Sequence, residues 1–420
     1  MLRKRTAAVL ASALLMLAQL AAAAEPSVTV TSSPRILYRA VESGCGPNFI
    51  PDSPARMFRR ADGNMELIAA HFEDWMMLGR NFGSLKASCQ SIMDPDEYNR
   101  KVQGHLWIQA TYTLDGRHIE GLISQDLSRT TMAEGCNPEN IPGRCWVNQI
   151  IGVSSGDMGT HFNPGSVVAS YGNTFPSNEQ WHFGFFTASN IVRQGDFYYV
   201  VLYQTPPSTP GLAGGMTQSG NCLFRTNTIL NPASWRAWTG TGFTYDANRG
   251  KGRCALISPA DSGPFRSIQY LPKDHQWIAL TAGRHQLPGD PRPVPGFYAM
   301  TSPDLMHWNG YARVMAVPLA ARSDSMDSVF SYPSLIDPDS STNNFETLDH
   351  ETAILVFTVH HLLRGTGTMN RDLEFVPVRV AVVQASRQCS TPGSTDARNY
   401  PPKRDLRMSE NPPSGARHKP

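Results

Sequence analysis

An acid, an arginine and a histidine lie within the segment 52–72, which reads DSPARMFRRADGNMELIAAHF. Asp52 opens one extended run, and His71 stands near the end of a second. The Asp-Gly turn at 61–64 between the two runs is a strong hairpin signal. Because antiparallel partners bring the start of one strand beside the end of the other, we expect Asp52 and His71 at one sheet edge. With Arg56 on the same strand, this grouping indicates a site rather than a core.

Other candidate side chains stand on or beside apolar runs spread over the chain. Arginine can bind hydroxyls, or a carboxylate bidentately, and aromatic rings can stack on a ligand ring. The alternatives are structural ion pairs for the arginines, a hydrogen-bonded buried histidine, and aromatic packing between sheets. The candidate substrate-binding residues are Arg56, His71, Trp107, Asn190, Arg266 and Tyr332.

The elements that must position these residues are five apolar hairpins that begin near residues 54, 107, 186, 266 and 332. Glycine (34) and proline (32) are plentiful, and long helix-period runs are absent after residue 25, so we expect an all-β chain. One such sheet cannot bury both of its faces alone, whereas sheets packed around an axis can. The repeats therefore predict an all-β, five-bladed β-propeller.

Residues 155–162, SGDMGTHF, fit the pattern S-x-D-x-G-x-x-F/W. It resembles the Asp-box of the β-hairpins in propellers such as sialidases. The serine and the aspartate of such a turn can bond backbone amides, and the aromatic residue can pack beneath it. We expect a structural role for it.

The two ends of the chain differ in composition from its middle. Three basic residues precede an apolar run that ends in small residues, the pattern of a signal peptide over residues 1–24. The alternative is an uncleaved membrane anchor, for which the run is short. Residues 386–420 are polar, proline-rich and basic, which predicts a disordered tail after a propeller domain over 25–385. We expect an exported protein, periplasmic or extracellular, without stable membrane insertion after cleavage.

Seven cysteines stand at wide spacing with no CxxC pair, which argues against zinc. In an oxidising compartment disulfides are expected. The preferred pairs are Cys136–Cys145, Cys222–Cys254 and Cys45–Cys89, which leaves Cys389 over. The formal charge of +2 gives no case for nucleic acid, which needs a concentrated basic face.

The segment 302–308, SPDLMHW, resembles the S-x-D-L-x-x-W blade ending of five-bladed glycosidases of the arabinanase/xylosidase and invertase types. Asp52 is similar to the aspartate that opens the first inner strand in those enzymes. FFTASNIV and SYPSLIDPDSSTNNFET also resemble uncharacterised bacterial exported propeller proteins. The resemblance covers about residues 40–383. It implies that Asp52 acts as general base in an inverting reaction, or as nucleophile in a retaining one.

Glycoside hydrolysis needs a second carboxyl group. The second and third inner strands of those enzymes carry acids, but here they read LWIQATY and FGFFTASN. The partner must then be Glu120, Asp126 or Glu179, and we favour Glu120 on the second strand of its hairpin. Its alternative interpretation is an exposed strand acid, and Asp52 itself could cap a turn.

The sequence thus predicts a carbohydrate-active propeller, a glycoside hydrolase using Asp52 and Glu120, with an oligo- or polysaccharide as substrate. The alternative is a non-catalytic carbohydrate-binding propeller that kept the scaffold. We expect no catalytic cofactor, although the axis leaves room for a structural cation. A monomer is expected.

Overall fold

The structure is a computed structural model that describes residues 25–71, 74–93, 105–128, 146–172, 182–207, 218–248, 252–319 and 326–383. The predicted signal peptide, the predicted tail, Glu179 and the Cys136–Cys145 pair lie outside these ranges. The described residues belong to one compact unit. They form strands and short 3₁₀ helices, so the expected all-β class is confirmed. The helices are η1 (Ala40–Glu42), η2 (Phe82–Ser84) and η4 (Pro232–Ser234).

The predicted hairpin at residues 52–72 is present and opens a four-stranded antiparallel sheet. Asn64 donates its backbone N–H to the Asp62 carboxylate (2.9 Å), and Gly63 has φ +81°, a conformation that glycine adopts at little cost. This turn joins the first two strands. The sheet runs in the order β3 (Pro51–Arg59), β4 (Met65–Ala70), β5 (Trp75–Gly79) and β6 (Lys86–Ser91).

Three further sheets complete the described fold. The largest has two antiparallel units that a short parallel pairing of β11 with β9 joins. Its strands are β7 (His105–Thr113), β8 (Ile119–Ser128), β9 (Trp146–Ser155), β10 (Asn163–Ala169), β11 (Phe183–Ala188), β12 (Val192–Gln194), β13 (Phe197–Thr205), β14 (Gly220–Thr226), β15 (Arg236–Trp238) and β16 (Phe243–Tyr245). The next is β17 (Phe265–Leu271), β18 (Gln276–His285), β19 (Val294–Ser302) and β20 (Asn309–Ala316).

The last sheet combines both ends of the described chain. Its C-terminal strands are β21 (Ser328–Ile336), β22 (Thr352–Leu363) and β23 (Thr366–Val383). The N-terminal strands β1 (Glu25–Val30) and β2 (Arg35–Arg39) both pair with β23. Residues 25–39 thus form two separate strands. The N-terminal strand β1 therefore lies at one edge of the last sheet.

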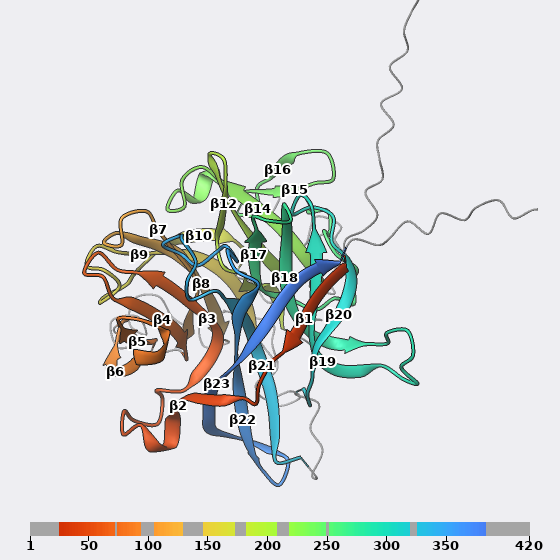
Figure 1. Ribbon diagram of the computed structural model, residues 1–420. Helices are drawn as coiled ribbons and strands as arrows, with labels where there is room; N and C mark the ends of the chain where they lie inside the picture. Colours follow the sequence, from red (N-terminus) through yellow and green to blue (C-terminus); the bar gives the residue numbers. More distant parts are fainter. Residues whose placement is uncertain are drawn as a thin grey trace, which may run out of the picture. The chain divides into compact units, whose positions relative to one another are not determined.

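The first strands of the five units contact one another in a circle, and Figure 1 labels β3, β7, β17 and β21 among them. β3 contacts β7 and β21, β17 contacts β21 and β11, and β11 contacts β7. These strands begin close to the five positions that the sequence predicts. Side chains that are far apart in the chain can therefore meet where these strands surround a common centre.

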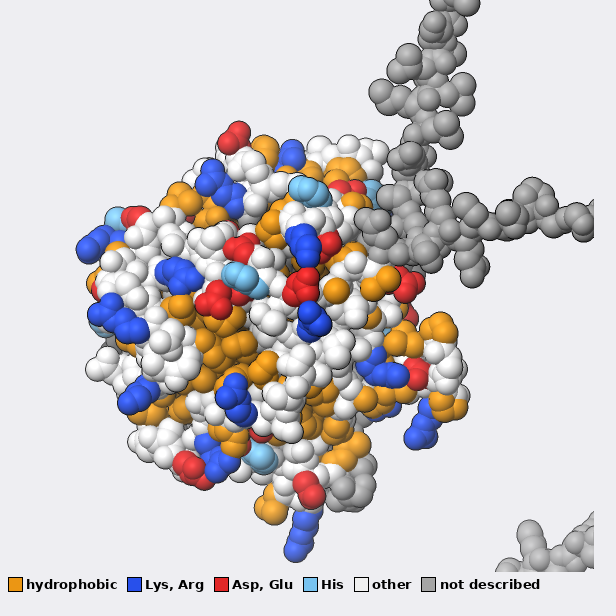
Figure 2. All heavy atoms as spheres, in the orientation of Figure 1, with side chains coloured by type: hydrophobic (Ala, Val, Ile, Leu, Met, Phe, Trp, Pro, Cys, Tyr) orange, Lys and Arg blue, Asp and Glu red, His pale blue; other side chains and the backbone are white. Residues whose placement is uncertain are grey.

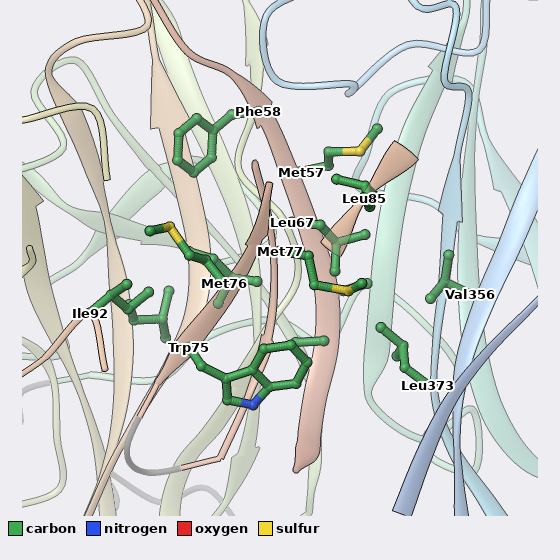
Figure 3. Packing of buried hydrophobic residues seen from close by; sticks show 14 of the residues in the cluster. Met57, Phe58, Leu67, Trp75, Met76, Met77, Leu85, Ile92, Val356 and Leu373 are labelled. Atoms are coloured by element: carbon green, nitrogen blue, oxygen red, sulfur yellow. The ribbon is translucent and has the colours of Figure 1, made fainter. Parts of the chain in front are cut away.

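Apolar clusters fill the space between neighbouring sheets. Figure 3 shows one of them, in which Trp75 and Met77 of β5 lie near Leu373 of β23. The Trp75 indole donates to the Ile50 carbonyl (3.1 Å), so its one polar group is satisfied in the core. Two further clusters lie between other pairs of sheets, and one lies between the two antiparallel units of the largest sheet. This packing holds the strands of the circle at fixed distances from one another.

Two expected covalent links and the expected Asp-box turn are present. Disulfides join Cys45 to Cys89 and Cys222 to Cys254, as predicted. In the turn, Gly159 N–H donates to Ser155 Oγ (3.0 Å), and His161 N–H donates to Asp157 (3.0 Å). Phe162 is buried. The structure thus gives this segment the structural role that its pattern predicts.

The face drawn in Figure 2 mixes basic and acidic side chains and has no concentrated basic area. Within the described ranges, no helix has the length and apolar character needed to cross a membrane.

Candidate functional site

Asp52 lies at the start of β3 and is held by three side chains from two other units, the sheet of β21–β23 and the unit of β7. Its carboxylate forms an ion pair with Arg371 of β23 and accepts a hydrogen bond from the Tyr332 hydroxyl (3.1 Å). Trp107 of β7 donates a third bond to it. The side chain remains 15% exposed and that of Arg371 16%, so solvent reaches both. The start of β3 is therefore the meeting point of the site.

Two opposing effects act on the Asp52 carboxyl. Burial raises its pKa above the usual 3.8, whereas Arg371 and Tyr332 favour the ionised form. The net direction is upward. The carboxylate thus has charged and hydrogen-bonded partners that hold its orientation, as a general base or a nucleophile requires.

Asp126 is a second carboxyl group within electrostatic range of Asp52. It stands near the end of β8, in register with His105, the first residue of β7. Burial raises its pKa to about 7, a bond from Asn148 opposes the shift, and the charge of Asp52 adds to it. A carboxyl with this pKa carries a proton part of the time at neutral pH and can act as a general acid.

Glu120, the acid that the sequence analysis favours, is not brought to Asp52. It lies near the beginning of β8, opposite Tyr112, six residues before Asp126 and therefore about 20 Å away along the strand. There it lines a separate cavity of about 270 Å³ with Tyr112, Tyr198 and His118. The physical reason is strand direction: β8 is antiparallel to β7, so only its last residues reach the end where β7 begins.

Four of the six candidate binding residues gather around Asp52. Tyr332 and Trp107 bond it directly, and His71 Nε2 lies 3.7 Å from its Oδ2. The Trp107 ring packs edge-on against His71, with centroids 6.2 Å apart. Arg266 lies over the Tyr332 ring, 5.2 Å from its centroid. The predicted neighbourhood of Asp52 and His71 at one sheet edge is present.

Two histidines at the site are neutral at pH 7. Burial and the charge of Arg371 lower the pKa of His71 to about 3, with a further contribution from His105. Burial and Arg371 likewise lower the pKa of His360 to about 3, with His361 contributing. His360 stands opposite Arg371 in the β22–β23 pairing and bonds Ser331 Oγ. Neither imidazole adds positive charge beside Asp52.

Arg56 takes a different position from the one expected of a substrate-binding residue. Its Nε donates to the Gln109 carbonyl (2.6 Å), and its Nη2 donates to the carbonyls of Ala188 and Arg266 (both 2.9 Å). Its Nη1 donates to the Ala55 carbonyl (3.1 Å) and to Ser334 Oγ (3.3 Å). The protein itself uses all five guanidinium donors. These acceptors come from all five strands of the circle.

The carbonyls that Arg56 binds lie at irregularities in the strands. Each of the five first strands shifts register where it passes the centre, at residues 51–56, 108–110, 186–188, 265–267 and 331–334. Such bulges remove carbonyls from the sheet ladder and leave them needing a partner. The Arg56 guanidinium therefore occupies the centre of the circle, the position that a structural cation on the axis would take. Within the described ranges, no group of three or more His, Cys, Asp or Glu is suited to hold a metal.

Asn190 also has a structural role, because its side chain bonds the backbone of a neighbouring strand. Its amide donates to the Ile268 carbonyl (2.7 Å) and accepts from the Ile268 N–H (2.7 Å), which joins the segment directly after β11 to β17. The side chain is buried and lies with Arg56 beside a small cavity at the centre. It positions two strands of the circle instead of offering groups to a ligand.

Comparison with known proteins finds no matching family model and no matching curated protein. Solved structures that are similar include a protein of unknown function from Dyadobacter fermentans, with 9% identity over 84% of this chain and 99% of that chain, TM-score 0.47. An α-L-arabinanase from Cellvibrio cellulosa has 12% identity over 77% and 90%, TM-score 0.40. An endo-1,5-α-L-arabinanase from Thermotoga petrophila has 10% identity over 80% and 74%, TM-score 0.46. The arabinanase type is thus among the structures this chain is similar to, as the sequence predicts.

Proposed function

We propose that this protein is a five-bladed β-propeller that hydrolyses glycosidic bonds, with Asp52 as base or nucleophile and Asp126 as acid. The five-bladed arrangement is supported by the circle of first strands, each followed by its own antiparallel partners. The observation that carries the reaction is a pair of carboxyl groups, Asp52 of β3 and Asp126 of β8, in which the charge of Asp52 raises the pKa of Asp126.

The environments of the two acids support different roles for them. Arg371, Tyr332 and Trp107 favour the ionised form of Asp52. Burial favours the protonated form of Asp126 at neutral pH. Glycoside hydrolysis needs one carboxylate and one carboxylic acid on opposite sides of the bond. Burial raises the pKa of both groups, and the charge of Arg371 opposes that rise at Asp52.

The polymer bound by this site is proposed to be an oligo- or polysaccharide outside the cytoplasm. Trp107 and Tyr332 are half-buried rings beside Asp52 that can lie against a sugar. The disulfides Cys45–Cys89 and Cys222–Cys254 support an oxidising compartment, periplasmic or extracellular. A cleaved signal peptide over 1–24, a domain over 25–385 and a monomeric state belong to the same proposal.

The test is a hydrolysis screen of the purified protein on aryl glycosides and on plant and bacterial polysaccharides. We expect Asp52→Asn to lower kcat by at least about 100-fold. Asp126→Asn should lower it most for poor leaving groups and least for activated aryl glycosides, since these need no protonation. Glu120→Gln is the matched control and should keep its activity. Unchanged activity in Asp52→Asn would remove that residue from the reaction.

A second function, carbohydrate binding without hydrolysis, is favoured by one observation. Arg371 already pairs with the Asp52 carboxylate, and that pairing competes with a role as base or nucleophile. In that case Asp52→Asn would weaken sugar binding in calorimetry, and no substrate in the screen would be cleaved by the unaltered protein.

A further inference from the structure

The charges around Asp52 are unusual for a site that acts on a neutral sugar. Two guanidinium groups lie within electrostatic range of Asp52. Arg371 forms an ion pair with it, and the charge of Asp52 favours the charged form of Arg266. The nearby His71 and His360 are neutral. When Asp126 holds the proton that an acid must donate, Asp52 is the one anion beside Arg371, Arg266 and the charged Arg56 that neighbours Arg266, so these cations outnumber the anion by two.

This excess of positive charge opposes the chemistry proposed above. The transition state of glycoside hydrolysis resembles an oxocarbenium ion, and positive charge therefore develops on the sugar ring. Like charges a few ångströms apart in a partly desolvated site repel each other strongly. A negative group on the substrate would offset the excess.

Arg266 is the cation with capacity left for such a group. Its Nη1 donates to Thr187 Oγ1 (2.9 Å), while its Nε is buried without a hydrogen-bond partner in the part of the chain that the structure describes. No ion pair within those residues includes Arg266, whereas Arg371 is paired with Asp52. An arginine can bind a carboxylate with Nε and one Nη together, in a bidentate arrangement.

The surroundings of Arg266 are built to hold it in place. Thr187 has φ +38° and Tyr332 has φ +56°, a backbone region that residues other than glycine rarely adopt. Thr187 bonds the guanidinium, and the Tyr332 ring lies against it. The Arg266 carbonyl is fixed by Arg56. Two uncommon backbone conformations thus coincide at the residues that contact this one side chain.

We propose that the glycan bound at Asp52 carries a carboxylate, as a uronic acid residue does, and that Arg266 binds that carboxylate. This inference rests on the proposed function and names its substrate class. A carboxylate has the single charge and the planar shape that one guanidinium edge matches. Binding it reduces the excess of positive charge at the site while Asp126 is protonated.

The test compares uronate-containing polysaccharides with their carboxyl-reduced forms. The probes are polygalacturonate, glucuronoxylan and alginate, each beside the same polymer reduced to the neutral sugar, with sulfated glycans as a third arm. Calorimetry with the full chain should show at least one uronate polymer bound about tenfold tighter than its reduced form. That preference should shrink as salt is raised from about 20 to about 200 mM.

The variants separate Arg266 from general charge effects. Arg266→Gln should abolish most of the preference, and Arg266→Lys should keep part of it, because lysine retains the charge but not the planar fork. Arg193→Gln, at an exposed arginine of β12, is the matched control and should leave the preference unchanged. Circular dichroism of each variant establishes that it is folded.

Three results would overturn the inference. Equal or tighter binding of the reduced polymers would refute it while leaving hydrolysis of neutral glycans intact. A preference for sulfated over carboxylated glycans would refute the carboxylate. A uronate preference that survives in Arg266→Gln would assign recognition to other residues. Failure of the folded protein to bind or cleave any glycan would count against the proposed function as well.

Discussion

Replacement of Arg56 by methionine tests how the five first strands are held together. Methionine fills much of the same volume but has no donors, so the four carbonyls of Ala55, Gln109, Ala188 and Arg266 lose a partner. A buried acceptor left unsatisfied costs about 1–3 kcal/mol. Four of them would cost roughly 4–12 kcal/mol, and water entering the space lowers this toward the smaller figure.

The opposing effect is the cost of burying the guanidinium itself. Burial, with the nearby Arg266, lowers the Arg56 pKa to about 9, so the group is still charged at pH 7. Removing a buried charge can stabilise a protein when its partners are removed too. Here the partners are backbone carbonyls that stay in place. The balance therefore favours a net loss of about 4 kcal/mol or more, much of the total stability of a typical domain.

The assay is urea unfolding at pH 7, followed by tryptophan fluorescence and far-ultraviolet circular dichroism. Arg56→Lys should lose less than Arg56→Met because the ammonium keeps three donors. Arg193→Met is the control at an exposed arginine and should change the free energy of unfolding by no more than about 0.5 kcal/mol. If Arg56→Met unfolds within about 1 kcal/mol of the unaltered protein, the central carbonyls do not depend on Arg56.

Three further predictions concern stability. Asp126→Asn should flatten the pH dependence of the free energy of unfolding. Because the folded state raises the pKa of Asp126, this group stabilises the protein below about pH 4, and that stabilisation is lost as pH rises through 7. Urea midpoints measured over this pH range test the prediction. His360→Gln should reduce the loss of stability between pH 6.5 and about 3. In this range the imidazole binds a proton in the unfolded chain but stays neutral in the folded protein. An unchanged loss of stability over this range would contradict the prediction. Cys254→Ala should cost about 3–4 kcal/mol because it opens the loop closed from Cys222, and reductant should then no longer lower the melting temperature of that region.

Much of the fold could be predicted from the sequence because its signals are local. The Asp62-Gly63 turn, the apolar runs on either side of it and the Asp-box pattern each act within a few residues. Cysteine spacing combined with the expected export gave two disulfides that the structure contains. Asp52 and His71 meet because a hairpin alone decides which strand ends lie together.

The rest of the site depends on register and on closure of the circle, which no local signal specifies. Asp126 was among the three candidate acids, but its choice over Glu120 required knowing which end of β8 reaches the start of β7. Arg371 reaches Asp52 only because the last sheet packs beside the first. Arg56 looked like a ligand-binding side chain because the bulges that turn five strands toward it leave no mark in the sequence.

The most direct test is a measurement of the pKa of Asp126 by carbon-13 NMR of protein with labelled aspartate, in the unaltered chain and in Asp52→Asn. If the two carboxyl groups are neighbours, the pKa of Asp126 should lie near 7 and should fall when Asp52 loses its charge. A value near 4 that does not move in Asp52→Asn would contradict the pairing on which the proposed reaction depends.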